Sequence, residues 1–176
     1  MTIRPVLIAF SGLPGAGKTT IARRVCARLG AVLLRIDSIE TALARSTRRI
    51  RPAEDAGYAV AYAVAADNLR AGLSVVADCV NDIALTRAAW ADMATDAAAF
   101  LLNVEVICSD DDEHRRRVET RTPDTEGLLL PDWQAVASRE FEPWTEPLLV
   151  LDTAILSVAD AVARVVARTT AASPPD

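Results

Sequence analysis

Short runs of apolar residues alternate along this chain with longer segments in which apolar residues recur at helical spacing. The run Val6–Phe10 is apolar at every position, which is typical of a strand buried on both faces of a parallel sheet. Four similar runs follow it, separated by segments of helical periodicity. The pattern predicts strands at 6–10, 31–36, 73–77, 100–108 and 148–151, and helices at 19–29, 37–44, 53–71, 81–98, 110–121, 133–139 and 157–170, capping residues included.

Strands that alternate with helices predict an α/β fold, because right-handed crossovers place the helices on both faces of a parallel sheet. We therefore expect a five-stranded parallel sheet within one domain. Ligands of such sheets bind at the carboxyl ends of the strands. The glycine-rich segment 12–18, Asp37 and Asp78 each stand at the end of a predicted strand, so we expect them to lie together at one edge of the sheet.

Length, charge and cysteine content limit the possible partners. The 176 residues fit about one domain, which we place at 1–172, with a frayed tail at 173–176. A net charge of −5 disfavours long nucleic acids and anionic membranes, and no apolar run approaches the ~18 residues of a membrane span. The three cysteines are odd in number and widely spaced, which favours free thiols in a cytoplasmic protein. We expect it to be a monomer or a homodimer.

The segment Gly12–Thr19 fits the phosphate-binding pattern G-x-x-x-x-G-K-[ST] at every position, and Lys18 within it is the only lysine of the chain. Glycines let several backbone N–H groups point into one hollow, where they bind phosphate oxygens. Lys18 would reach the β- and γ-phosphates of a nucleotide, and the hydroxyl of Thr19 would bind Mg²⁺. The predicted nucleotide-binding residues of this loop are Gly12, Pro14, Gly15, Ala16, Gly17, Lys18, Thr19 and Thr20.

Asp78 ends the apolar run of the third predicted strand. A carboxylate at that position can hold the magnesium ion of a bound nucleotide, directly or through water. The next residue is Cys79 and not the glutamate that polarises water in many ATPases, which weakens a hydrolase interpretation. The structural alternative is that Asp78 serves only as a turn or helix-capping residue.

Asp37 ends the second predicted strand, at the same edge of the sheet as the phosphate-binding loop. From there its carboxylate could accept the proton of a hydroxyl group that attacks the γ-phosphorus of ATP. Aspartate is also favoured as the N-cap of a helix, and a helix is predicted to follow. The sequence leaves open whether Asp37 is a general base or a helix cap.

Arginine clusters at 45–51 and again at 115–121. In the second cluster Arg117 and Arg121 are four residues apart, so they share one face of the predicted helix and could contact the same phosphate. Guanidinium groups form bidentate hydrogen bonds with phosphate oxygens and stabilise the negative charge of a transition state. The single histidine, His114, stands among charged residues, and we expect it to face solvent.

Together these residues resemble the small P-loop kinases of the AAA-type ATP-binding kinase-like family, which lies near chloramphenicol phosphotransferase, the zeta toxins and polynucleotide kinase. The resemblance implies a P-loop NTPase fold with strand order 2-3-1-4-5, a helical lid at about 111–147, and ATP and Mg²⁺ as cofactors. It also implies roles for Asp37 as base, for Arg117 and Arg121 as lid arginines, and for Thr153 beside the adenine. The similar segments are Gly12–Thr19, Arg35–Asp37, Val75–Asp78, Glu113–Arg121 and Leu149–Thr153.

Three functions remain open at this point. The first is a kinase that moves the γ-phosphoryl group of ATP to a hydroxyl of a small-molecule acceptor. The second is a nucleotide-dependent switch or ATPase that acts on a protein partner, and the third is a kinase of nucleotide or polynucleotide 5′ ends. A GTPase is disfavoured, because guanine recognition through Asn-Lys-x-Asp needs a second lysine. The segments 45–62 and 122–147, where the acceptor would bind, match no substrate-defined family.

Overall fold

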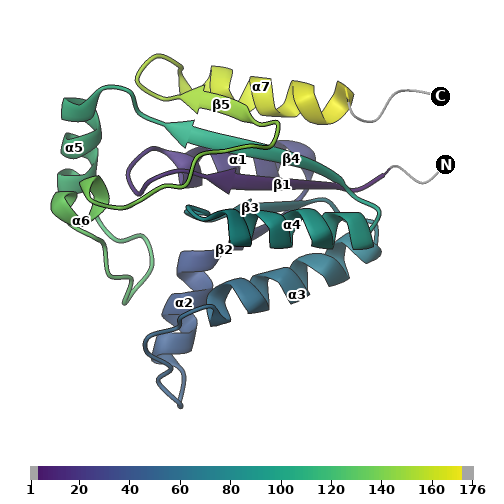
Figure 1. Cartoon of the computed structure of the whole chain (residues 1–176), viewed down its shortest axis with the longest axis horizontal. Helices are drawn as coiled ribbons and strands as arrows, with labels where there is room; N and C mark the ends of the chain where they lie inside the picture. Colours follow the sequence, from purple (N-terminus) through teal and green to yellow (C-terminus); the bar gives the residue numbers. More distant parts are fainter. Residues whose placement is uncertain (1–3, 172–176) are drawn as a thin grey trace.

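The computed structural model describes residues 4–171, which form a parallel sheet of five strands in the order β2-β3-β1-β4-β5 (Figure 1). Each pair of neighbouring strands is parallel, which confirms the predicted fold class and strand order. The strands are β1 (Val6–Ser11), β2 (Val32–Arg35), β3 (Val75–Asp78), β4 (Phe100–Ile107) and β5 (Leu149–Asp152).

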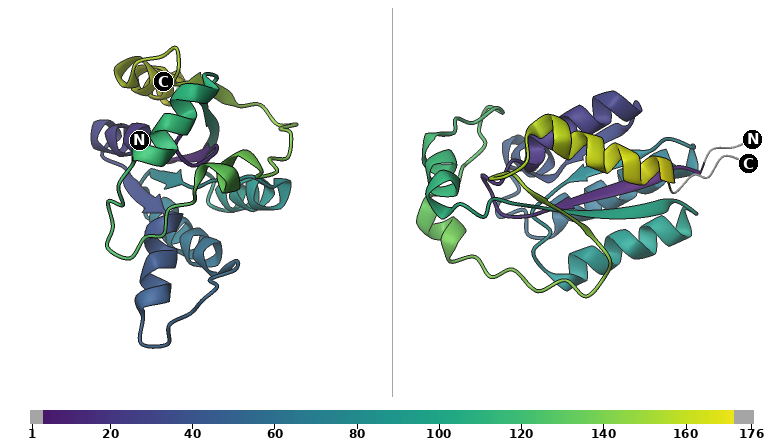
Figure 2. Two further views of the ribbon diagram at one scale, coloured as in Figure 1. Left: turned by 90° about the vertical axis from the view of Figure 1, so that its left-hand side faces the viewer. Right: turned by 90° about the horizontal axis from the view of Figure 1, so that it is seen from above.

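Helices cover both faces of this sheet. Helices α1 (Lys18–Leu29) and α7 (Val158–Ala171) pack on one face, whereas α3 (Ala56–Arg70) and α4 (Ala84–Asp96) pack on the other (Figures 1 and 2). The remaining helices, α2 (Ile36–Arg45), α5 (Asp111–Thr120) and α6 (Trp133–Ala137), lie near the carboxyl ends of the strands. The crossovers therefore leave that end of the sheet for binding, as in other parallel sheets.

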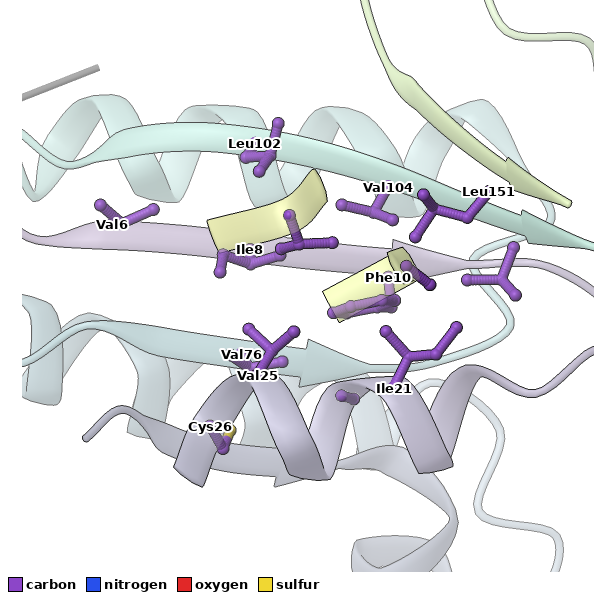
Figure 3. Packing of buried hydrophobic residues seen from close by; sticks show 14 of the residues in the cluster. Val6, Ile8, Phe10, Ile21, Val25, Cys26, Val76, Leu102, Val104 and Leu151 are labelled. Atoms are coloured by element: carbon purple, nitrogen blue, oxygen red, sulfur yellow. The ribbon is translucent and has the colours of Figure 1, made fainter. Parts of the chain in front are cut away.

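The central strand β1 contributes to two hydrophobic cores at once. Ile8 and Phe10 point to the face of α1, where they pack with Ile21 and Val25 (Figure 3). Leu7 belongs to the other cluster, which also holds the fully buried Trp90 of α4. Because successive residues of a strand face opposite ways, a strand that is buried on both faces must be apolar throughout. This explains the continuous apolar runs of the sequence.

Helices α5 and α6 lie over the carboxyl end of the strands, where the resemblance predicts a lid, and Figure 2 (left) looks onto them. The chain that returns from α6 to β5 passes α4 and is attached there by Glu142. The carboxylate of Glu142 accepts a hydrogen bond of 2.6 Å from the backbone N–H of Ala84, and its carbonyl accepts one of 2.8 Å from Arg87. The lid is therefore tied to the body of the domain at its far end.

Several local expectations need correction. The predicted helix cap at 81–82 is wrong, because α4 begins at Ala84, and Asn81 lies buried in the left-handed region with φ 54°.

The three cysteines are free and buried, as expected. No helix within residues 4–171 has the length and hydropathy needed to cross a bilayer. The expected frayed tail at 173–176 lies outside the described residues.

Candidate active site

The loop between β1 and α1 has the backbone shape that phosphate binding requires. Gly12 has φ 130°, and a Cβ atom there would lie 2.1 Å from the carbonyl oxygen of Val106, so only glycine fits. The Gly12 N–H donates to the carbonyl of Val80 at 3.0 Å, which anchors the start of the loop beside the end of β3. The loop is thus fixed against two neighbouring strands.

The loop leads into an uncapped helix. Gly17 is the N-cap of α1, and the first turn contains neither a capping side chain nor an acidic residue. The first N–H groups of a helix lack partners within the helix, and the helix dipole favours negative charge there. The N-terminus of α1 together with the loop therefore has the chemistry that an anion-binding site requires.

Lys18 lies within this site and is buried. Its Nζ donates to the carbonyl oxygens of Gly12 at 2.7 Å and Leu13 at 3.0 Å, so the side chain folds back along its own loop. Burial lowers the pKa of Lys18, while the negative charges of Asp78 and Asp37 oppose that change. These two carboxylates are therefore the charges that favour the ammonium form.

A cleft of about 890 Å³ opens beside the loop. It collects most of the residues that the sequence singled out, although they come from five separate stretches of chain. Gly12 and Ala16 do not line it; they line a smaller pocket of about 220 Å³ instead. The predicted residues that line the cleft are Pro14, Gly15, Gly17, Lys18, Thr19, Thr20, Asp37, Asp78, Arg117, Arg121 and Thr153.

Asp78 is buried at the floor of the cleft, and its Oδ2 atom has no hydrogen-bond partner within the described residues. The nearest cation is Arg35, whose Nε lies 3.8 Å from that oxygen. Burial raises the pKa of Asp78, and Lys18 opposes the rise. An unpaired buried carboxylate oxygen is costly without a ligand. Oxygen donors are what Mg²⁺ prefers, so Asp78 and the adjacent Thr19 fit this metal.

Asp37 is not a helix cap. The N-cap of α2 is Arg35, no side chain caps that helix, and Asp37 is its second residue. The carboxylate is about half exposed (49%) and lies 3.4 Å from Nη2 of Arg35. The alternative that Asp37 serves as the cap is therefore wrong, and its carboxylate lines the cleft.

The two lid arginines have different surroundings. Arg117 donates from Nε to Glu113 and from Nη1 to the hydroxyl of Thr153, both at 2.8 Å. Thr153 in turn lies 2.8 Å from the carbonyl of Ala16, so Arg117 is connected to the back of the loop. Arg121 has no partner for Nε or Nη2 among the described residues. Burial lowers its pKa, and the charge of Asp37 opposes this.

His114 is the residue that sequence reasoning misjudged. It does not face solvent but is buried, and its Nε2 lies 2.9 Å from the carbonyl oxygen of Pro14 in the loop. A weak signal existed: His114 and Val118 are the only buried residues of α5, four apart on one face of an otherwise charged helix. Asp124 was also missed, although it forms ion pairs with Arg23 and Arg35 at the mouth of the cleft.

Comparison with known proteins places this site in a family. A family model described as an AAA domain matches residues 7–136. Curated proteins gave no match. Among solved structures, a candidate kinase from Chloroflexus aurantiacus J-10-fl has a TM-score of 0.73 at 22% identity, covering 99% of this chain and 100% of that one.

Two further structures were solved with nucleotides or their analogues. The APS kinase CysC of Mycobacterium tuberculosis, in complex with AMPPNP and APS, has a TM-score of 0.67 at 20% identity, covering 94% of this chain and 97% of that one. Kti12 of Chaetomium thermophilum, in complex with ADP-AlF3, has a TM-score of 0.69 at 23% identity, covering 96% and 100%. At such identities the likeness concerns the fold. The chain therefore belongs to the AAA-domain family that matches most of its length, and its fold is that of the kinase-like P-loop NTPases.

Proposed function

We propose that this protein is an ATP-dependent phosphotransferase that moves the γ-phosphoryl group of Mg-ATP to a hydroxyl of a small-molecule acceptor. The observation that carries the proposal is that the phosphate-binding loop and the carboxylate of Asp37 line one cleft. Asp37, Lys18 and Arg121 all line this cleft, which supports a position of the Asp37 carboxylate beside the γ-phosphate of a bound nucleotide.

The chemical step needs a base, and Asp37 is proposed for it. The acceptor oxygen attacks the γ-phosphorus and forms the new P–O bond, while the bond to the β–γ bridging oxygen breaks. That oxygen leaves with the electron pair as part of ADP, and the proton of the acceptor hydroxyl passes to the carboxylate of Asp37. The carboxylate of Asp37 is about half exposed and lines the cleft, so the hydroxyl of an acceptor can reach it.

Positive charge near the loop would stabilise the transferred group. Lys18 supplies an ammonium from the loop, and Arg121 supplies a guanidinium whose Nε and Nη2 are free to donate. Thr19 and Asp78 would hold Mg²⁺, which when bound neutralises phosphate charge. Helices α5 and α6 would limit the access of water from the lid side, which favours transfer over hydrolysis.

The size of the cleft supports a small acceptor. Its volume of about 890 Å³ lies within the range of roughly 300–1,000 Å³ that is usual for small-molecule sites, and a nucleotide must share it. Of the exposed arginines at 48, 49 and 51, none lines the cleft. These three arginines therefore do not extend the basic lining of the cleft toward a long nucleic acid. We also propose that the protein acts in the cytoplasm, as a monomer or a homodimer.

The test is phosphoryl transfer from γ-labelled ATP to a panel of hydroxyl compounds, among them sugars, amino sugars, sugar acids, phenicols, nucleosides and oligonucleotide 5′ ends. Asp37→Asn should bind ATP normally but transfer at least ~10²-fold more slowly, the usual contribution of a general base. Asp67→Asn is the matched control, because that carboxylate is 85% exposed on α3. Transfer by Asp37→Asn at the rate of the control would exclude the base role.

The same assay separates the competing functions. Label on an oligonucleotide end would identify a polynucleotide kinase. ATP consumption without a labelled acceptor would favour a switch that acts on a protein partner.

A further inference from the structure

Two carboxylates extend into the cleft from one face of α2. Asp37 and Glu40 are three residues apart within this helix, so their side chains are neighbours, and both line the cleft. The proposed chemistry uses only Asp37. Glu40 is partly buried and lies outside the nucleotide-binding loop, so neither the loop nor the proposed chemistry explains its position in the cleft.

Glu40 lies farther along α2 than Asp37. Asp37 is the second residue of this helix, directly after the end of β2, whereas Glu40 is the fifth residue and its side chain lies against Gly57 at the start of α3. Glu40 is therefore displaced from Asp37 toward α3, and on this side we expect the body of an acceptor.

The cations at this end of the cleft are already paired. Nη1 of Arg139 lies 3.2 Å from Oδ2 of Asp82, and Nη1 of Arg35 lies 2.7 Å from Oδ1 of Asp124. Arg35 approaches Asp37 only at 3.4 Å. Glu40 itself forms no ion pair within the described residues, so its carboxylate is available to pair with a cationic group of a ligand in the cleft.

The fold makes room for the Glu40 side chain in this position. A Cβ atom at Gly57 would lie 2.6 Å from Cγ of Glu40 and 2.8 Å from its Oε1, so any larger residue at the start of α3 would displace the carboxylate. The next residue, Tyr58, also lines the cleft. Carboxylates beside an aromatic ring are a combination that binds organic cations, because the ring face is negative.

We propose that Glu40 and Tyr58 bind an ammonium group of the acceptor, which makes the acceptor an amine-bearing hydroxyl compound of the amino-sugar or amino-alcohol class. The proposal rests on the proposed kinase activity. Burial and the charge of Asp37 raise the pKa of Glu40, and a bound ammonium would oppose both effects. An acceptor that carries a carboxylate or phosphate would instead add a third negative charge and be repelled.

The test measures kcat/KM for transfer from γ-labelled ATP to matched acceptors that differ in one substituent: an amino sugar such as glucosamine, the neutral sugar, and the corresponding sugar acid, with amino alcohols and their deaminated counterparts. We expect the amine to exceed the neutral compound at least ~10-fold and the acid by more, as for a charge-assisted hydrogen bond. Transfer only to neutral or acidic acceptors would overturn the inference and leave the kinase intact. No transfer to any hydroxyl compound would instead overturn the proposed function itself.

Glu40→Gln provides the second arm, because it keeps the size of the side chain and removes its charge. It should raise KM for the amine acceptor at least ~10-fold and lower the preference for the amine over the neutral acceptor by the same factor. Glu140→Gln, at an exposed position outside the cleft, is the control. An equal loss of transfer to amine, neutral and acidic acceptors would show that Glu40 does not recognise charge, which overturns the inference.

Discussion

Nε2 of His114 lies 2.9 Å from the carbonyl oxygen of Pro14, and this contact joins the lid helix α5 to the phosphate-binding loop. Because a carbonyl oxygen can only accept, Nε2 is the protonated ring nitrogen in this contact. The ring also packs edge-on against Trp133 of α6, with centroids 5.3 Å apart and an interplanar angle of 81°. One buried side chain therefore connects the loop with both helices of the lid.

Replacing His114 with phenylalanine should weaken nucleotide binding. The substitution keeps an aromatic edge against Trp133 but removes the hydrogen bond to the loop, which costs about 1 kcal/mol, or about fivefold in Kd for ATP. Titration calorimetry with Mg-ATP measures this, with Trp133→Phe as a variant that leaves the hydrogen bond in place. Unchanged affinity in His114→Phe would mean that the contact does not preorganise the loop.

Asp78→Asn should stabilise the free protein while it abolishes the response to Mg-ATP. Burial raises the pKa of Asp78 above 3.8, so the folded chain binds this proton more tightly than the unfolded chain does. Ionisation therefore costs stability, and the cost arises as the pH rises through the interval between the usual and the raised pKa. At pH 7 the amide removes this cost, so the variant should have the higher Tm, and each ~1 kcal/mol removed corresponds to about 2–4 °C.

Two controls sharpen this prediction. Well below pH 3.8 the carboxyl is protonated in both states, so the difference in Tm between Asp78→Asn and the wild type should vanish. Excess Mg-ATP should raise the Tm of the wild type but not that of the variant, because only a bound ligand shifts the unfolding equilibrium. A variant that melts below the wild type at pH 7 contradicts the proposed cost of the buried charge.

Asp124→Asn should loosen the segment that crosses the mouth of the cleft. The carboxylate of Asp124 lies 2.6 Å from Arg23 of α1 and 2.7 Å from Arg35 of β2. Although burial raises the pKa of Asp124, the bonds and charges of Arg35 and Arg23 lower it overall, so their stabilisation is lost only as the pH falls below about 3.8. We expect a loss of about 1 kcal/mol.

Hydrogen exchange is the appropriate readout for this variant, since the amides of residues 122–130 should exchange faster while those of the sheet stay unchanged. Glu126→Gln is the matched control: Glu126 pairs with Arg45 in the same segment, but its side chain is 86% exposed. Equal exchange in both variants would show that Asp124 does not hold the segment.

The sheet and the loop follow from local patterns, whereas the contacts across the cleft do not. Strands buried on both faces are apolar along almost their whole length, so β1 and β3 are visible as continuous apolar runs. The loop is visible because phosphate binding demands glycines and a lysine at fixed spacing. Both signals depend only on residues that are close together in the chain.

The errors lie where distant segments meet. His114 bonds to a carbonyl 100 residues away, and Asp124 pairs with an arginine 101 residues away, so neither partner leaves a trace in the local sequence. The cap prediction at Asp37 failed for a related reason. Ile36 is buried and already belongs to α2, so the helix starts directly at the end of β2 and Arg35 takes the cap position. Tertiary packing overrides the preference of aspartate for a cap.

The substitutions Arg117→Lys and Arg121→Lys should affect different kinetic parameters of the proposed phosphoryl transfer. The Nε and Nη2 atoms of Arg121 have no partner among the described residues, so its guanidinium could form bidentate hydrogen bonds with the phosphoryl group in the transition state. Arg121→Lys should lower kcat about 10²-fold with little change in KM for ATP.

Arg117 uses its guanidinium to hold Glu113 and Thr153, so Arg117→Lys should instead weaken ATP binding several-fold at nearly constant kcat. Steady-state kinetics on both variants, with unfolding curves to confirm the fold, measures this split. If Arg121→Lys changes only the affinity, the guanidinium serves ground-state binding, and transition-state charge must be stabilised by Lys18 and the metal alone.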